Sequence, residues 1–590
     1  MFLSISACGD VKKEQVGDTI ENKRPNVILV MTDDQGIGDL GAHGNPWLKT
    51  PNIDQFYKES VRLIDFHVSP MCTPTRAALM TGLYPINNGV WATYKGRDLL
   101  HPDMVTMPEV FRDNGYATGI FGKWHLGDNY PSRPTDRGFE FAVHHASGGV
   151  GELSDYWGNN YFDDTYLVNN EPQEFEGYCT DVWLDEAIKF IKAKKEEPFF
   201  VYIPTNAPHT PLYVDDKYVK PYKSLEGTKI PEAKFYGMLA NIDENFGRLE
   251  AALSELRLAE NTIVVFCTDN GSASGVSKDY KLGWNKGFRG KKGEKLEGGH
   301  RVPFFIRWPK AKIQGGKDLN DLTAHVDILT TLAGLCNLEL PEDFKGDGID
   351  FSSRLLGRSE PEDRTVFVHH RQDFLPPEPI NNTALLKGDW RLLDGDKLYD
   401  IVKDRKQLNN LAQDYPEVVT DLLKENETFT KQSATRKEYQ EFAHFQIGTD
   451  YQQKTKLTIQ HAIGDDGPIW KQEEIAAGIK NTNASQPIEI VEKGTYRFSL
   501  MRWPEECNVT IHGVPDVNPK GGIYTYEKVY PDRARVTVFG KTLEKEIFPE
   551  DKKVIFEIAL EPGKSMLRTH FIEDGEEYGV YYTYVELVEI

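Results

Sequence analysis

Two pairs of residues that could bind a metal ion each follow an apolar run directly. Asp33-Asp34 comes after Thr32, and Asp269-Asn270 comes after Thr268. Functional groups gather beyond the carboxyl ends of strands in an open parallel sheet, so we expect both pairs at one edge. Three carboxylates and one amide oxygen suit Ca²⁺, with Mg²⁺ as the second choice, and would repel one another without a cation. Capping of following helices is the alternative, which is common for a single Asp. Because Asp33-Asp34 and Asp269-Asn270 each follow a predicted buried strand, the metal site is favoured over capping.

A cysteine lies where a helix is predicted to begin. Residues 72–82 read Cys-Thr-Pro-Thr-Arg-Ala-Ala-Leu-Met-Thr-Gly. Pro74 suits a first helical turn, because its fixed φ fits the helix and its missing N–H costs nothing there. Cys72 is therefore expected at a helix N-terminus, where the dipole favours an anion and activates a nucleophile. A buried structural thiol is the alternative for a cysteine taken alone.

Basic residues follow two further apolar runs. Gly122-Lys123-Trp124-His125 comes after the run at Ile120, and Asn206-Ala207-Pro208-His209 comes after the run at Val201. Taken singly, such a lysine is ordinarily a solvated loop charge and such a histidine a hydrogen-bonded core residue. Their position at strand ends, like that of the acidic pairs, makes them candidates for the same site.

The elements that must position these residues alternate between strands and helices. Short apolar runs separated by helical patterns indicate an α/β fold with a mostly parallel central sheet flanked by helices. Apolar residues from Phe235 to Leu256 recur at spacings of three and four and predict a long amphipathic helix. A second helix is expected around Trp183, with Thr180 as its N-cap. The predicted strands are 26–31, 62–68, 116–121, 198–203, 261–267 and 303–308.

The alternation ends near residue 346. Residues 364–369, 390–393 and 397–401 predict a small antiparallel sheet, followed by a helix over about 415–431. Beyond about 450, alternating stretches at 488–501, 535–539, 554–560 and 578–588 predict a separate all-β module. The expected divisions are a tether (1–24), a catalytic α/β domain (25–345), a C-terminal subdomain (346–450) and a β-rich accessory module (451–590).

The motif at Cys72 resembles that of the type I, formylglycine-dependent sulfatases of the alkaline phosphatase superfamily. Cys-x-Pro-x-Arg is followed by Leu-x-Thr-Gly, as in that family, with Thr75 where serine is commoner. The resemblance covers about residues 25–430 and includes these further segments: Asp33-Asp34, Gly122 to Gly127, Ala207 to His209, Thr268 to Gly271, Arg289 to Gly293, Glu297 to Pro303, and Leu398 to Leu411.

The resemblance implies a role for each site residue. Cys72 would be oxidised to formylglycine (3-oxoalanine) by a formylglycine-generating enzyme or a radical maturase, and its hydrate would attack sulfur. His209 and Lys292 would contact the sulfate and assist the leaving alcohol, and His125 would take a proton to expel sulfate. Lys292 is preferred over Lys291 from its spacing to Gly293. Arg76 and Lys123 would hold the oxygens of residue 72 and the metal shell, and Ca²⁺ would be bound by Asp33, Asp34, Cys72, Asp269 and Asn270.

A sulfated mono- or oligosaccharide, approached end-on, is the expected substrate. Mixed aromatic, basic and acidic residues could line a pocket for a charged sugar, with packing or surface exposure as the ordinary alternative for each. The candidates are Trp91, Arg97, Asp98, His300, His370 and Arg371, with Tyr94, Tyr156, Trp157 and His369 as further possibilities. A phosphate or phosphonate monoester hydrolase and an inactive carbohydrate-binding relative are the competing functions. Lys and Arg around the position of a second metal disfavour the first, and the intact Cys72 and both histidines disfavour the second.

The net charge of the chain and its N-terminal sequence indicate which partners and which cellular location to expect. A formal net charge of −22 disfavours nucleic acid and anionic membrane surfaces, and the chain contains no apolar run long enough to span a bilayer. Ile5-Ser6-Ala7-Cys8 resembles a bacterial lipobox, although only seven residues precede Cys8. We therefore expect an exported protein, periplasmic or anchored to the cell surface through a lipid at Cys8, with a disordered tail as the alternative.

Overall fold

The computed structural model describes residues 24–360, 362–464, 469–480, 485–516 and 524–589. The predicted lipid attachment at Cys8 lies outside the described residues. Among the helices of the described ranges, none combines the length and the apolar character that a bilayer crossing needs.

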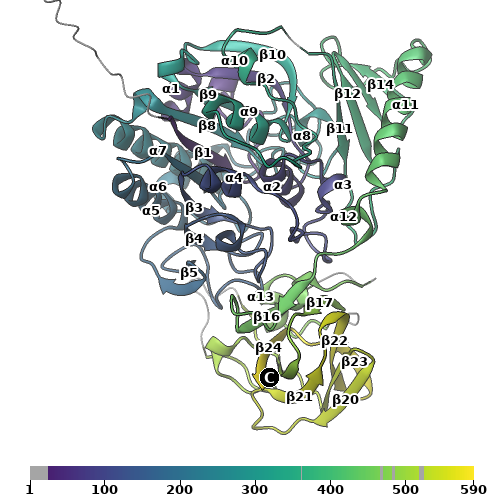
Figure 1. Ribbon diagram of the computed structural model, residues 1–590. Coiled ribbons are helices and arrows are strands. Elements are labelled where there is room, and N and C mark those ends of the chain that lie inside the picture. Colours follow the sequence, from purple (N-terminus) through teal and green to yellow (C-terminus); the bar gives the residue numbers. More distant parts are fainter. Residues whose placement is uncertain (1–23, 361, 465–468, 481–484, 517–523, 590) are drawn as a thin grey trace, which may run out of the picture.

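A ten-stranded mixed sheet forms the centre of the larger part of the molecule (Figure 1). Its middle strands are parallel: β1 (Asn26–Thr32) lies between β7 (Phe199–Pro204) and β8 (Thr262–Thr268), and β3 (Ala117–Lys123) lies beside β7. All four are buried along their whole length, which is why they are nearly continuous apolar runs. The remaining strands are β2 (Val61–His67), β4 (Phe141–His145), β5 (Thr165–Val168), β6 (Glu171–Glu174), β9 (Phe304–Arg307) and β10 (Lys317–Ala324).

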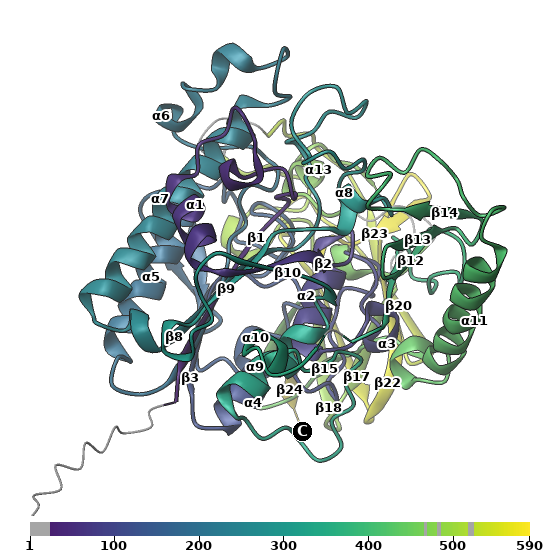
Figure 2. The same cartoon turned by 90° about the horizontal axis from the view of Figure 1, so that it is seen from above.

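Helices cover both faces of this sheet. Figure 2 shows α1 (Pro51–Glu59), α5 (Cys179–Ala193) and α7 (Ala233–Glu255) on one side. The other side carries α2 (Cys72–Thr81), α4 (Met107–Asp113), α9 (Asp327–Cys336) and α10 (Ser352–Leu355). The amphipathic pattern from Phe235 to Leu256 corresponds to α7, so that prediction is confirmed. The N-cap prediction is wrong: α5 begins at Cys179 with Tyr178 as its N-cap, and Thr180 lies inside its first turn.

A four-stranded antiparallel sheet follows, with one strand more than the sequence patterns indicated. It comprises β11 (Thr365–His369), β12 (Thr383–Lys387), β13 (Trp390–Leu393) and β14 (Lys397–Asp400). The helix α11 (Pro416–Ser433) packs on it through the apolar face that contains Leu422. The additional strand, β12, is buried, and its short apolar run carries no alternation that distinguishes a strand from a helix.

The last part of the chain, residues 445–589, is rich in strands and is called the C-terminal β part below. One sheet contains β15 (Phe445–Ile447), β17 (Gln486–Ile490), β19 (Arg533–Val538), β20 (Lys541–Glu546), β22 (Gly563–Glu573) and β23 (Glu576–Gly579). The other contains β16 (Lys454–Thr458), β18 (Gly494–Met501), β21 (Val554–Leu560) and β24 (Tyr582–Glu589). A short helix, α13 (Gln472–Ala476), and two 3₁₀ turns interrupt the strands, so this part is not purely β.

The C-terminal β part shares its apolar core with the larger part. Leu99, Leu153 and Trp157 belong to the same buried cluster as the inward side chains of the two C-terminal sheets. Figure 1 shows this part below the large sheet, on the side of β4 and β5. The apolar contact therefore fixes it against the loops that follow the central strands.

Candidate active site

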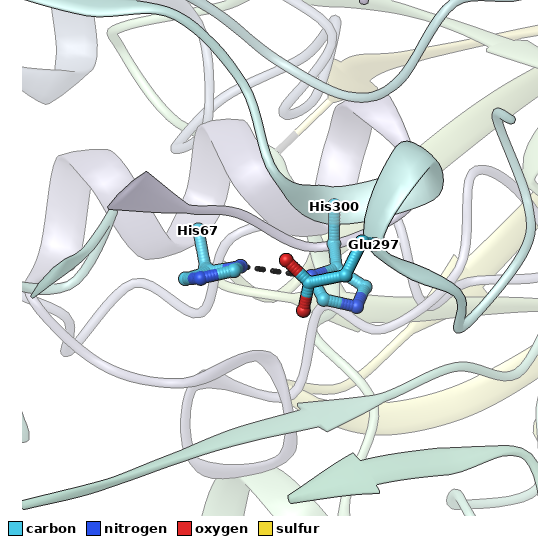
Figure 3. A group of neighbouring side chains, drawn as sticks. All are labelled: His67, Glu297 and His300. Atoms are coloured by element: carbon cyan, nitrogen blue, oxygen red, sulfur yellow. Dashed lines mark hydrogen bonds between the residues drawn. The ribbon is translucent and has the colours of Figure 1, made fainter. Parts of the chain in front are cut away.

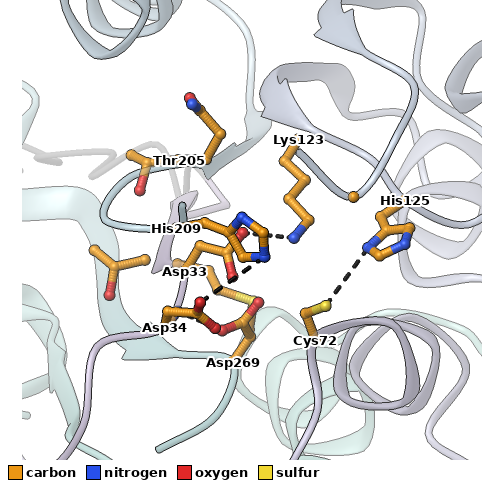
Figure 4. A network of polar contacts seen from close by, with 12 residues as sticks. Asp33, Asp34, Cys72, Lys123, His125, Thr205, His209 and Asp269 are labelled. Carbon is orange, nitrogen blue, oxygen red and sulfur yellow. Dashed lines mark hydrogen bonds and ion pairs between the residues drawn. The ribbon is translucent and has the colours of Figure 1, made fainter. Parts of the chain in front are cut away.

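Four central strands deliver polar residues to one edge of the sheet. Asp33 and Asp34 follow β1, and Asp269 and Asn270 follow β8, while Lys123 is the last residue of β3. His209 lies five residues beyond β7. Because these strands are parallel neighbours, their carboxyl ends meet. Figure 4 shows the side chains of Asp33, Asp34, Asp269, Lys123 and His209 grouped together with Cys72 and His125.

The acidic group is compact and buried. Oxygen atoms of Asp33 and Asp269 and the sulfur atom of Cys72 lie within 4.8 Å of one another. The backbone N–H of Asp34 donates to Oδ1 of Asp269 at 3.1 Å, and the amide of Asn270 donates to Oδ1 of Asp34 at 2.9 Å. The structure therefore brings together all five residues predicted as metal ligands.

Each of the three carboxylates has its own basic partner. Nζ of Lys123 lies 2.5 Å from Oδ2 of Asp33, and Nζ of Lys292 lies 2.6 Å from Oδ1 of Asp34. Nη2 of Arg76 lies 2.7 Å from Oδ2 of Asp269. Basic partners of this kind keep an acidic cluster charged in a dry site.

The partners act unequally on the carboxyl groups. Burial and the neighbouring charge of Asp269 raise the pKa of Asp33 well above its usual value, and Lys123 only partly opposes this. Burial alone would also raise the pKa of Asp34, but Lys292 and His209 lower it below its usual range. The neighbouring positive charge is therefore too small to balance the carboxylate of Asp33.

Two acceptor atoms in the cluster are available for a cation. Oδ1 of Asp33 and Oδ1 of Asn270 are buried and have no hydrogen-bond partner among the described residues. A buried acceptor without a partner is costly unless a ligand satisfies it. With oxygen as the prevailing donor type and excess negative charge at Asp33, the residues fit a hard divalent cation such as Ca²⁺ or Mg²⁺.

Cys72 is the first residue of α2, as the sequence predicted, and Met71 is the N-cap in an extended conformation. Its Sγ lies 3.6 Å from Nδ1 of His125. Burial raises the pKa of the Cys72 thiol, although Lys123 and Lys292 oppose the shift. Activation of the thiol by the helix terminus is therefore outweighed by burial, and an unmodified Cys72 is a poor nucleophile at neutral pH.

Both predicted catalytic histidines are uncharged at neutral pH. Burial and the charge of Lys123 lower the pKa of His125 well below its usual value. Burial and Lys292 lower the pKa of His209 to about 3, although Asp34 opposes this. Each ring can therefore accept a proton during a reaction.

Hydrogen bonds orient the two rings. The hydroxyl of Thr73 lies 3.0 Å from the His125 ring nitrogens. Nδ1 of His209 donates to the carbonyl of Thr210 at 2.6 Å, which places Nε2 on the side of Asp34, at 3.8 Å from its Oδ2.

The two neighbouring lysines have different contacts. Lys292 pairs with Asp34 inside the cluster, whereas Nζ of Lys291 donates to the carbonyl of Val276 at 3.1 Å. The contacts support the choice of Lys292 as the lysine of the site.

A cavity of about 460 Å³ opens over these groups. Its floor includes Cys72, His125, His209 and Lys292. The volume is in the range of roughly 300–1,000 Å³ that is typical of small-molecule sites. The other walls are formed by Gly148 to Glu152, Asn159 and Asn160, Thr210, Pro211 and Tyr213, and by Gln460, Trp470, Lys471, Glu473 and Tyr524 of the C-terminal β part.

The sequence analysis did not identify Glu152 or the residues of the C-terminal β part as site residues. The one local signal was the run Gly148-Gly149. A Cβ at Gly148 would lie 2.5 Å from Cε1 of His125, so the loop must have glycine there to approach the ring. Gln460 and Trp470 carry no comparable local signal, because their place in the site depends on contacts with residues hundreds of positions earlier.

The six residues proposed to bind substrate have other contacts, and none belongs to the described lining of the cavity. Nε1 of Trp91 donates to the carbonyl of Asp373 at 3.0 Å, and the Arg97 guanidinium stacks on the Trp91 ring at 4.0 Å. Oδ2 of Asp98 lies 2.6 Å from Nδ1 of His461. These contacts give the three residues a packing role.

His370 and Arg371 lie after β11. The backbone N–H of His370 donates to the carbonyl of Asn382, and Arg371 donates to the carbonyl of Pro376 at 3.0 Å. Both contacts stabilise the connection between β11 and β12. A role of these two residues in substrate binding stays a prediction.

His300 belongs to a second buried cluster, with His67 and Glu297 (Figure 3). Nδ1 of His300 lies 2.9 Å from Nδ1 of His67. Arg391 of β13 lies 2.6 Å from Glu297, and Arg301 pairs with the same carboxylate. Because two guanidinium groups already neutralise Glu297, the cluster is an ion-pair network that joins the four-stranded sheet to the large one.

Comparison with known proteins shows which family model and which relatives this chain matches. Residues 25–338 match the family model described as Sulfatase. The chain is 32% identical over 397 residues to N-acetylgalactosamine-6-sulfatase of Canis lupus familiaris, which covers 64% of this chain and 73% of that protein. It is 28% identical over 501 residues to N-acetylgalactosamine-6-O-sulfatase of Bacteroides thetaiotaomicron, which covers 70% and 94%.

A solved structure has the same architecture. The crystal structure of Ps i-CgsB in complex with k-i-k-neocarrahexaose superimposes with a TM-score of 0.63 and 26% sequence identity. The superposition covers 72% of this chain and 95% of that chain.

Proposed function

This chain belongs to the sulfatase family and is a sulfuric ester hydrolase, and on that basis we propose that it removes sulfate from a carbohydrate with formylglycine at position 72 and a bound Ca²⁺ ion. The observation that carries the proposal is that Asp33, Asp269 and Cys72 meet within 4.8 Å, with Cys72 lining the cavity. A thiol that burial keeps protonated is a poor nucleophile, which supports its replacement by the oxidised residue.

The metal and the modified residue supply the electrophilic and nucleophilic chemistry. Asp33, Asp34, Asp269, Asn270 and residue 72 would hold the ion, which when bound withdraws charge from a sulfate oxygen. Hydrated formylglycine would supply the attacking hydroxyl.

The other site residues bind charge and move protons. Lys292 faces the cavity with its charge held at Asp34, so it is placed to bind a sulfate oxygen. His209 lines the same wall, oriented through Thr210, and would contact the departing alcohol together with Lys292, whose ammonium supplies the positive charge that the leaving oxygen needs. His125 is uncharged and beside residue 72, so it can take a proton from that residue when sulfate leaves.

Arg76 and Lys123 have a supporting role. Both are almost completely buried against carboxylates, at Asp269 and Asp33. They offset part of the negative charge of these acids and hold their carboxylates in place beside residue 72, a role that suits a planar guanidinium and a buried ammonium.

A sulfated carbohydrate is the proposed substrate class. Two of the relatives reported above are named for N-acetylgalactosamine 6-sulfate, and one was solved with a neocarrahexaose. The cavity combines a cationic floor with aromatic and amide walls, which suits a sugar that carries one sulfate group. Action on a terminal sugar, approached end-on, is part of the proposal. Export from the cell is part of the proposal, because large sulfated polysaccharides must be degraded outside.

Assay of the purified protein and a Cys72→Ala variant on sulfate and phosphate esters tests this function. We expect sulfate release by the wild-type protein and none by the variant, together with a peptide mass that shows conversion of Cys72 to formylglycine. A phosphate ester hydrolysed faster than any sulfate ester would favour the phosphomonoesterase alternative. A wild-type protein with converted Cys72 and no activity on either ester would contradict the proposal.

A further inference from the structure

Part of the wall of the active-site cavity comes from residues far along the chain. Gln460, Trp470, Lys471, Glu473 and Tyr524 all belong to the C-terminal β part, and all line the cavity above Cys72. The cavity is therefore complete only when this part is docked on the larger part.

Backbone hydrogen bonds attach the segment around Trp470 to the loop that borders the catalytic groups. The N–H of Leu153 donates to the carbonyl of Trp470 at 2.9 Å, and the N–H of Gln472 donates to the carbonyl of Gly151 at 3.2 Å. The side-chain amide of Gln472 donates to the carbonyl of Glu152 at 3.0 Å. Such direct pairing fixes the wall in place more precisely than apolar packing alone.

Glu152 and Glu473 are acidic residues of this wall, and Glu152 is the one that Gln460 contacts. The N–H of Gly148 donates to its Oε2 at 2.9 Å, and the amide of Gln460 donates to the same atom at 3.3 Å. Ser147 donates to Oε1 of Gln460 at 3.3 Å, which orients that amide. A carboxylate in a cavity for an anion is unfavourable near the sulfate, but it is a strong acceptor for hydroxyl groups.

Trp470 supplies an apolar surface on the same wall. Its side chain is 36% exposed, and its ring centroid lies 5.5 Å from that of Tyr94. Tyr213 and Tyr524 line the cavity as well. A partly exposed tryptophan ring beside hydrogen-bond acceptors suits the apolar face and the hydroxyl edge of a sugar ring.

We propose that the C-terminal β part is the specificity element of this active site: Trp470 stacks on a sugar ring of the substrate, and Glu152, oriented by Gln460, accepts a hydrogen bond from an uncharged hydroxyl of the same saccharide. The inference rests on the proposed sulfatase function. It adds the chemical nature of the part of the substrate that carries the sulfate group. The cations at the floor bind the sulfate, and this wall selects a saccharide over a flat aryl group. A second anionic group beside Glu152 is disfavoured by charge.

Comparison of two kinds of substrate tests the proposal. The substrates are nitrophenyl sulfate and the fastest-hydrolysed member of a panel of sulfated oligosaccharides from chondroitin sulfate, carrageenan and heparan sulfate. For Trp470→Ala and Gln460→Ala we expect KM on the oligosaccharide to rise about tenfold, equivalent to one good contact, with kcat nearly unchanged. Activity of both variants on nitrophenyl sulfate should fall much less than activity on the oligosaccharide, because an aryl sulfate makes fewer contacts with this wall.

A matched control is Tyr530→Ala. Tyr530 is also an exposed aromatic residue of the C-terminal β part, at 59% exposure, and it contacts His512 rather than the cavity. This variant should behave like the wild-type protein on both substrates.

The outcomes separate the inference from the function on which it rests. Equal losses on both substrates, or no loss on either, would overturn the role of Trp470 and Gln460 while the enzyme remained a sulfatase. The same holds if the wild-type protein hydrolyses nitrophenyl sulfate but no oligosaccharide. A wild-type protein with converted Cys72 that hydrolyses no sulfate ester would instead contradict the proposed function itself.

Discussion

Sγ of Cys72 lies 3.6 Å from Nδ1 of His125, and both groups are buried at the floor of the same cavity. At this distance a proton can pass directly between residue 72 and the uncharged ring of His125.

His125→Ala should lower kcat by roughly 10²–10⁴-fold, because a positioned general base contributes about that much. KM should change little, since His125 is placed to act on residue 72 more than on the substrate. Steady-state kinetics on a sulfate ester measure both quantities. His512→Ala is the control, because His512 contacts Tyr530 outside the cavity and the variant should keep nearly full activity.

Lys292→Ala should lower kcat/KM by roughly 10²–10³-fold, the usual loss when one charge-stabilising donor is removed from an active site. The neighbouring Lys291→Ala variant should change kcat/KM little, since its amine donates to the Val276 carbonyl outside the cluster. Equal effects of the two substitutions would contradict the assignment of Lys292.

Calcium should stabilise the folded protein. A ligand that binds only the folded state at a hundredfold excess over Kd adds about 2.7 kcal/mol. Thermal unfolding with and without Ca²⁺ after chelation measures the gain, and Mg²⁺ should give a smaller shift. The gain should disappear in Asp34→Ala and persist in His300→Ala, because His300 belongs to the separate cluster with Glu297. A shift that disappears only in the His300 variant would place the ion at the other cluster.

His461 should make stability depend on pH. Burial alone lowers the pKa of this histidine, but the carboxylates of Asp128 and Asp98 raise it well above its usual value. The stabilisation is therefore fully present below about pH 6.5, the unfolded-state value, and is lost as the pH rises through the higher folded-state pKa.

The measurement is the difference in Tm between the wild-type protein and His461→Asn at a series of pH values. The difference should be largest at about pH 6 and shrink in alkaline solution. A difference that grows with pH would show that the ring is held uncharged in the folded protein.

Arg391→Ala should lower the free energy of unfolding by about 3–5 kcal/mol, because it leaves Glu297 and Asp65 with less positive charge in a buried network. Chemical denaturation measures the change. Lys431→Ala serves as a control, since Lys431 forms an exposed pair with Glu427 and its loss should not be measurable. Equal stability of the two variants would contradict the structural role of the network.

The central strands and the catalytic floor could be predicted from the sequence because their signals are local. Buried parallel strands are continuous apolar runs, and the residues that follow them must meet at one edge. For this reason Asp33, Asp269, Lys123 and His209 could be grouped before any contact was known. The start of α2 was equally local, since Pro74 marks a first turn.

The walls of the cavity could not be predicted in this way. Glu152 and Gln460 are 308 positions apart, and Asp98 and His461 are 363 apart. Trp91, Arg97 and Asp98 have the aromatic and charged character of a sugar site. The same residue types also form a buried cation–π stack and an interdomain ion pair, and composition does not distinguish these uses. Strand β12 was missed for a similar reason, because a short buried run has no periodicity.

The hydrogen bond between Gln460 and Glu152 joins a loop made early in translation to a segment made near its end. All residues of the floor, from Asp33 to Lys292, precede Gln460 in the chain, so this wall is the last part of the site to be synthesised. A premature stop codon or a protease cut before Gln460 would therefore remove Gln460 and Trp470 from the wall and uncover Leu99, Leu153 and Trp157, which the C-terminal β part buries.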